Sequence, residues 1–162
     1  MHVYNKNLAR ITVPFVGGKL IGKFAVKNAR KDYKKNIKPP FSPPGYIFPK
    51  VWPVLYASMG IAYTIAKNTK YRKMTKNITI SHYTQLGLNY LWSLLYFKYK
   101  LRGLALIESY VLLLAVIAMS INFYKTNKFS GIIMIPYIMW SVFASYLTTG
   151  NWILNKDNPD YL

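Results

Sequence analysis

The chain has 162 residues, of which 52% are hydrophobic and 17% aromatic, and 22 Lys and Arg against 4 Asp and Glu give a formal net charge of +18. This balance excludes a disordered basic tail, which would be poor in aromatic residues, and is atypical of a soluble nucleic-acid-binding domain. The absence of cysteine excludes disulfides, thiolate metal sites and a cysteine nucleophile. Basic residues instead flank apolar stretches of about 20 residues, which is typical of a small integral membrane protein.

The apolar stretches predict an all-α integral membrane protein in which residues 1–162 form a single five-helix bundle. We expect transmembrane helices at residues 8–26, 49–66, 78–97, 103–124 and 129–154. The first stretch contains Arg10, Lys19 and Lys23, whose long side chains can reach an interface from within a span. Basic residues lie at both ends of the expected bundle, so its orientation stays open and both faces should attract anionic lipid head groups. No nucleic-acid-binding motif accompanies this charge, so we expect no nucleic-acid partner.

The longest expected connection, residues 27–48, contains two Pro-Pro pairs. Prolines hold the backbone in extended or turn conformations, so the end of this loop should be stiff. Two interpretations are open at this point. The loop is either a lid over a pocket, formed by Phe41, Pro43 and Pro44, or a rigid connector between two helices.

Three of the expected helices carry aromatic and polar residues at helical spacing, so each set shares one helix face. Taken singly, each face is typical of helix packing or of an interfacial aromatic belt. Together, three such faces in a small bundle would line a cavity for a flat, apolar, sparsely polar ligand such as a sterol or a tetrapyrrole. The faces comprise Trp52, Tyr56, Met59 or Gly60, and Tyr63; Gln85, Asn89, Trp92 and Tyr96; and Pro136, Trp140, Phe143 or Ala144, and Leu147.

A few further residues carry weaker signals. Glu108 lies inside an expected span, and we expect it to reach the head-group region and pair with a Lys or Arg; the alternative is a buried functional carboxylate. His2 and His82 have no neighbouring metal ligands, so we expect interfacial or solvated side chains and no metal site. Gly18 and Gly22 form a GxxxG pattern, which favours packing within the bundle and leaves a homodimer open. No catalytic triad, phosphate loop or nucleotide fingerprint is present, which argues against ordinary hydrolase, kinase or dehydrogenase chemistry, and we expect no cofactor.

Four segments, in order and in register, resemble one membrane-protein family. Residues 43–60 read PPGYIFPKVWPVLYASMG, and Val13-Pro14 with Gly17-Gly18 precede them in the first helix. The third helix has the pattern Gln85-Leu86-x-x-Asn89-x-x-Trp92, and the fifth has Pro136-Tyr137-x-x-Trp140-x-x-Phe143-Ala144-x-x-Leu147. Over nearly its whole length the chain is similar to the translocator proteins, also called tryptophan-rich sensory proteins or peripheral benzodiazepine receptors (TspO/MBR).

The resemblance implies a five-helix membrane bundle whose pocket opens under the first loop and binds porphyrins, sterols and benzodiazepine-site ligands. Trp52 and Trp140 match pocket tryptophans that, in bacterial relatives, are linked to porphyrin breakdown. The other expected ligand-binding positions, matched by the resemblance or lying on the same faces, are Tyr56, Asn89, Trp92, Phe143, Ala144 and Leu147.

The chain also departs from the family pattern. Phe41 stands where the family usually has a tryptophan before a Pro-Pro pair, which keeps an aromatic ring but loses the indole N–H donor. Thr148 replaces the asparagine of a Leu-Asn pair near the end of the fifth helix. In the sterol-recognition region of animal members, Thr149 and Gly150 occupy the tyrosine region, which argues against high-affinity cholesterol binding through that motif.

The expected function is that of a membrane receptor or transporter-like protein for porphyrins or sterol-like lipids. One alternative is a porphyrin-degrading enzyme, dependent on light or oxygen, in which a tryptophan supplies a radical. Another alternative is a membrane scaffold for protein partners. The similarity of the first helix to eukaryotic members implies the mitochondrial outer membrane, whereas a bacterial source would imply a bacterial membrane.

Overall fold

The computed structural model describes residues 2–26, 29–69, 75–159 and 161 of the chain; residues 27 and 28, at the start of the expected loop, lie outside this part. The described residues form helices and connections, with no strand among them, which confirms the all-α prediction. The helices are α1 (His2–Ala25), α2 (Ala29–Lys35), α3 (Phe48–Asn68), α4 (Thr75–Ser93), the π-helical turn η2 (Leu94–Lys98), α5 (Arg102–Thr126), α6 (Lys128–Ile133) and α7 (Ile135–Asn155).

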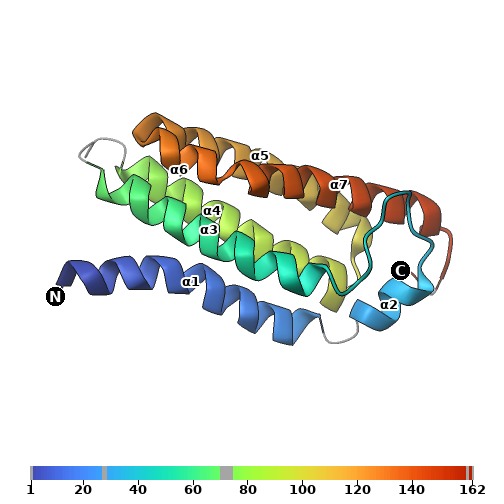
Figure 1. The fold of residues 1–162 in the computed structure, drawn as a ribbon. Coiled ribbons are helices and arrows are strands. Elements are labelled where there is room, and N and C mark those ends of the chain that lie inside the picture. The colour runs from blue at the N-terminus through green and yellow to red at the C-terminus, as the bar shows by residue number, and fades with distance from the viewer. Residues whose placement is uncertain (1, 27–28, 70–74, 160, 162) are drawn as a thin grey trace.

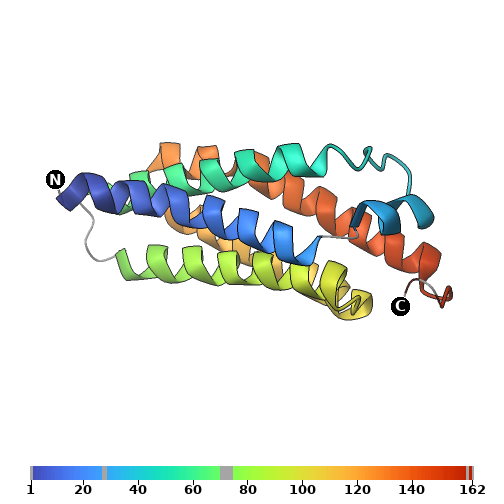
Figure 2. The same ribbon diagram turned by 90° about the horizontal axis from the view of Figure 1, so that it is seen from below.

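The long helices lie side by side along one axis (Figures 1 and 2). α1 packs mainly on α3, and α5 packs against both α4 and α7. The short helix α2 lies at the end of the bundle where α7 ends, and the start of α1 lies at the other end (Figure 1). The proline-containing connection from α2 to α3 therefore runs over the end of the bundle where α3 and α5 begin.

Each predicted range corresponds to an observed helical segment, but the ends and interruptions differ, and α1 ends at Ala25, one residue before the end of the expected range 8–26. The expected helix at 78–97 is α4 followed by the turn η2, where the backbone N–H of Tyr99 donates to the carbonyl of Leu94 at 2.9 Å. The expected helix at 129–154 is interrupted at Met134, between α6 and α7. Pro136 explains this break, because proline has no N–H to continue the helical hydrogen bonds and is tolerated in the first turn of a new helix.

Close contact between α1 and α3 depends on glycine. A Cβ built on Gly60 would lie 2.7 Å from the Cα of Ile11, and one built on Gly18 would lie 2.2 Å from the ring of Tyr56. A Cβ on Gly22 would meet nothing within 4 Å. Gly18 thus serves internal packing, as the GxxxG pattern favoured, whereas Gly22 makes no such close contact.

The surface of the bundle is apolar as well as its core. Large hydrophobic side chains are exposed on the outer sides of the long helices, among them Leu20, Phe24, Ile107, Leu114 and Met139. A soluble monomer rarely exposes contiguous apolar surface on this scale, and a lipid environment removes the cost of doing so. Among the described residues, α5 and the segment α6–α7 (128–155) are long and apolar enough to cross a membrane.

Candidate functional site

The connection between α2 and α3 is fixed to the end of the bundle by contacts along its length. The side chain of Asn155, in the last turn of α7, accepts from the backbone N–H of Ile37 at 2.9 Å and donates to its carbonyl at 2.8 Å. Pro39 is buried against Gly150, where an added Cβ would lie 2.5 Å from the proline ring. The hydroxyl of Tyr146 donates to the carbonyl of Pro40 at 2.9 Å. The connection is therefore an anchored cover.

The next part of the cover is held from α2. The hydroxyl of Tyr33 donates to the carbonyl of Pro43 at 2.5 Å, and its ring contacts Phe48 edge-on at 5.6 Å. Burial raises the pKa of Tyr33 above its ordinary value, which keeps this hydroxyl protonated and able to donate. Phe48 in turn contacts Trp140 on α7, with ring centroids 6.0 Å apart. An aromatic chain thus links the cover to the interior of the bundle.

Beneath the cover, the faces predicted from the sequence enclose a cavity of about 20 Å³. This volume is about that needed for one water molecule, so the pocket is closed in this conformation. Its lining combines three predicted residues with four that the sequence reasoning did not select: Trp52, Trp92, Ala144, Ser109, Leu112, Ser141 and Ser145.

The other predicted ligand-binding residues do not line this cavity: they are Tyr56, Asn89, Trp140, Phe143 and Leu147. Trp140 and Phe143 contact each other edge-on at 5.8 Å, and Leu147 is buried. Tyr56 stacks at a tilt on Trp52, with centroids 5.6 Å apart. Pro136, expected on the Trp140 face, is exposed at the start of α7.

Asn89 lies in a chain of buried hydrogen bonds that crosses the bundle. Its side-chain oxygen accepts from the hydroxyl of Tyr56 at 2.5 Å, and its amide donates to the hydroxyl of Tyr137 at 3.1 Å. Tyr137 donates onward to Gln85 at 3.0 Å, and the Gln85 amide contacts the sulfur of Met59 at 2.8 Å. Because the Asn89 side chain already has partners on α3 and α7, a ligand would have to displace one of them to bind it directly.

The three lid residues are placed differently from one another. Pro43 is held through its carbonyl by Tyr33, and Pro44 is exposed. Phe41 is 89% exposed and has a left-handed backbone with φ 61°, which is uncommon for a residue with a bulky side chain. The Phe41 ring therefore points away from the cavity. The cover contacts the bundle through Pro39 and through the backbone carbonyls of Ile37 and Pro40.

Three of the four unpredicted lining residues are serines, whose hydroxyls bond to backbone carbonyls. Ser141 donates to Tyr137 at 2.8 Å, Ser109 donates to Leu106 at 2.7 Å, and Ser145 crosses to the carbonyl of Ser109 at 3.2 Å. These bonds satisfy the hydroxyl protons and leave small side chains at the cavity wall. The spacing of Ser141 and Ser145, four residues apart in an apolar helix, was the signal available in the sequence.

Two expectations about ionisable residues are wrong. Glu108 does not pair with a Lys or Arg: it is 7% exposed, and within the described part of the chain neither carboxylate oxygen has a hydrogen-bond partner. His82 is not interfacial, because it is buried and stacked on Tyr63 with ring centroids 4.0 Å apart. In both cases the environment of the side chain depends on which face of the helix carries the residue, and not on its distance from the helix end. The side chain of His2 lies outside the described residues.

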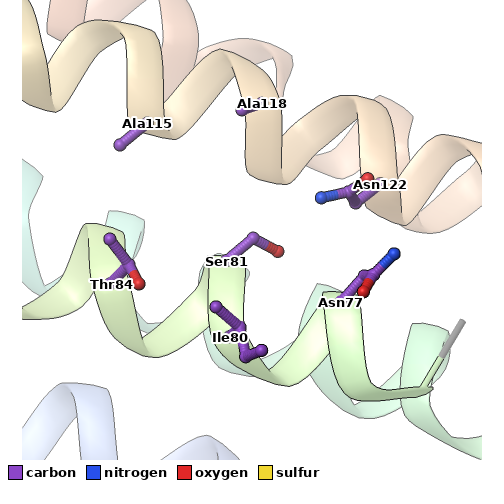
Figure 3. A pocket seen from close by; sticks show the side chains of 7 residues that line it. All are labelled: Asn77, Ile80, Ser81, Thr84, Ala115, Ala118 and Asn122. Atoms are coloured by element: carbon purple, nitrogen blue, oxygen red, sulfur yellow. The ribbon is translucent and has the colours of Figure 1, made fainter.

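A second hollow, of about 310 Å³, lies between α4 and α5 near the far end of the bundle (Figure 3). Figure 3 shows the amides of Asn77 and Asn122 facing each other across it, with Ser81 and Thr84 on the α4 side. Asn77, Thr84 and Ala118 are exposed, so this hollow is an open groove on the surface. None of the residues predicted for the pocket lines it.

An all-helical bundle with an apolar outer surface and a capped aromatic cavity defines the class, a helical membrane protein. The model of the TspO/MBR family matches residues 10–153, and the chain belongs to this family. The chain is 32% identical over 148 residues to the tryptophan-rich protein TspO of Archaeoglobus fulgidus, covering 91% of this chain and 93% of that protein. It is 27% identical over 146 residues to the translocator protein of Bos taurus, covering 89% and 86%. The family resemblance inferred from the motifs is therefore confirmed, and it supports a membrane receptor or transporter-like role.

Proposed function

We propose that the protein binds porphyrins, sterol-like lipids or benzodiazepine-site ligands in the cavity beneath the α2–α3 connection. The observation that carries this proposal is the convergence of Trp52, Trp92 and Ala144, from three helices, on one enclosed cavity. Large aromatic faces with few polar groups suit a flat apolar ligand. Since the cavity holds about 20 Å³, binding requires the aromatic side chains or the cover to move apart.

The first test is quenching of tryptophan fluorescence by protoporphyrin in the purified, detergent-solubilised protein, with a sterol titrated in parallel. We expect saturable quenching, and an apparent Kd raised about fivefold to tenfold in Trp92→Phe, because Trp92 lines the cavity and phenylalanine offers a smaller aromatic face. Trp152→Phe is the matched control, because Trp152 lies against Tyr161 and away from the cavity lining. Equal Kd values for the two variants and the wild type would contradict the assigned pocket.

A porphyrin-degrading enzyme is the second candidate, favoured by the oxidisable chain of Trp52, Tyr56 and Tyr90, with successive ring centroids 5.6 and 6.2 Å apart. It predicts products from bound porphyrin under light and oxygen that are lost in Trp52→Phe. Binding without products supports the receptor. Absence of any saturable ligand response would favour the scaffold alternative.

We propose that all five long segments cross the bilayer, that is, α1, α3, α4–η2, α5 and α6–α7. Their parallel arrangement and the exposed apolar side chains support this topology. We also propose a homodimer. For a eukaryotic source we propose the mitochondrial outer membrane as the location, and similar proteins come from archaea and animals alike. Labelling of single cysteines introduced into the cysteine-free chain, at the loop ends, tests the topology.

A further inference from the structure

The interior of the bundle contains a carboxylate that the fold leaves unpaired. Both oxygens of Glu108 are buried, and no described residue donates a hydrogen bond to either of them. The nearest cation along the chain, Arg102, is committed to Asp32, with an N–O distance of 3.5 Å, and to the rings of Tyr96 and Tyr161. A buried carboxyl without a partner is costly, and ionisable groups inside membrane bundles commonly mark functional positions.

Glu108 adjoins the cavity through its own helix. It precedes Ser109 and lies one turn before Leu112, and both of these residues line the cavity. Residues four apart lie on the same side of a helix, so Glu108 shares the side of α5 that Leu112 presents to the cavity. Glu108 is not itself among the lining residues, so a ligand must widen the cavity along α5 to reach its carboxyl group.

The lining contributed by α4 carries the complementary group. Trp92 lines the cavity, and its indole N–H is buried without an acceptor among the described residues. The indole N–H of Trp140, next to the lining residue Ser141, is likewise buried without an acceptor among the described residues. An acceptor on α5 and donors on α4 and α7 together match a hydroxyl group, which donates and accepts through a single atom.

We propose that Glu108 is the hydrogen-bond acceptor of the pocket and that it selects flat apolar ligands bearing a hydroxyl group. This inference rests on the proposed function, since it requires a ligand in the cavity. The hydroxyl donates to Glu108 and accepts from an indole N–H, so a ketone at the same position keeps the second bond and loses the first.

The test measures discrimination between two ligands that differ only in this donor. A fluorescent polyene sterol bound to the detergent-solubilised protein reports binding by energy transfer from tryptophan, and cholesterol or its 3-keto analogue displaces it. Leaving a buried acceptor without its donor costs about 1–3 kcal/mol, so the wild type should prefer the hydroxyl about tenfold. In Glu108→Leu the preference should fall to about one. Glu108→Gln, which keeps the shape and a neutral acceptor, should give roughly threefold.

Two controls separate the outcomes. Ser120→Ala removes another buried polar group of α5, outside the cavity lining, and should leave the tenfold preference unchanged. Protoporphyrin has no hydroxyl, so its Kd should change less than twofold in Glu108→Leu. If wild type and Glu108→Leu bind saturably with the same sterol preference, the role of Glu108 is overturned but the proposed function is not. A loss of porphyrin binding in Glu108→Leu without a change in sterol preference would also overturn the role of Glu108. Absence of saturable binding by the wild type for every ligand overturns the proposed function itself.

Discussion

Replacement of Arg102 should release the cover of the pocket while the long helices remain folded. Arg102 is the first residue of α5 and is 2% exposed. Its guanidinium lies 3.5 Å from the carboxylate of Asp32 on α2 and 4.1 Å from the ring centroid of Tyr161 in the C-terminal segment. One side chain therefore connects three segments that are distant in the sequence. Arg102→Met keeps an apolar stem of similar reach and removes the charge.

The magnitude follows from the burial of the two partners. Removing one partner of a fully buried ion pair costs about 3–5 kcal/mol, but Asp32 is 18% exposed and can be rehydrated, so we expect about 2 kcal/mol from the pair. Loss of the cation–π contact with Tyr161 adds about 1 kcal/mol. The sum of about 3 kcal/mol raises the population of the detached cover roughly a hundredfold.

Limited trypsin digestion is the assay, because Lys34, Lys35 and Lys38 lie in the segment that would detach. Cleavage there should be roughly a hundredfold faster in Arg102→Met when opening precedes cleavage. Lys100→Met is the matched control: Lys100 lies 3.8 Å from the same carboxylate, but its side chain is 43% exposed, and an exposed pair is worth less than about 1 kcal/mol. Equal cleavage rates in the two variants would refute the assignment of Arg102 as the anchor.

Three further predictions concern packing, buried polar groups and pH. Gly18→Ala should force α1 away from α3 and lower the melting temperature, at a cost of about 1–3 kcal/mol in stability. Gly22→Ala should be neutral or slightly stabilising, because an added Cβ there meets no neighbour. Equal effects of the two variants would contradict the close contact of α1 with α3 at Gly18. Tyr137→Phe should cost about 1–3 kcal/mol in denaturant unfolding, because two buried amides of α4 each lose one hydrogen bond. The exposed Tyr110→Phe should cost under about 0.5 kcal/mol, and similar costs for the two variants would argue against the buried network. Burial raises the pKa of Tyr33 above its value in the unfolded chain. The protonated Tyr33 therefore stabilises the attached cover below pH 10, and this stabilisation declines as the pH rises above 10. Tryptic cleavage of the cover should accelerate above pH 10 in the wild type, and an identical acceleration in Tyr33→Phe would exclude Tyr33 as the cause.

Most of the fold could be predicted from the sequence because it depends on local composition. The lengths of the apolar stretches located the five long helical segments. Helical spacing within three of these segments selected the faces that carry Trp52, Trp92 and Ala144, which line the cavity. Motifs in register along the chain also identified the family. These signals are local in the sequence, since helices are closed by their own hydrogen bonds and helical periodicity groups residues without knowledge of their partners.

Only the tertiary structure decided which polar groups have partners. The pairing of Arg102 with Asp32 and the bonds of Asn155 to the Ile37 backbone join segments that are 70 and 118 residues apart. Burial of Glu108 without a partner depends on the rotation of α5 against α4 and α7, which a position near the end of a span does not reveal. Helical periodicity states which residues share a face, but the packing of several helices determines whether that face meets lipid, a neighbouring helix or a cavity.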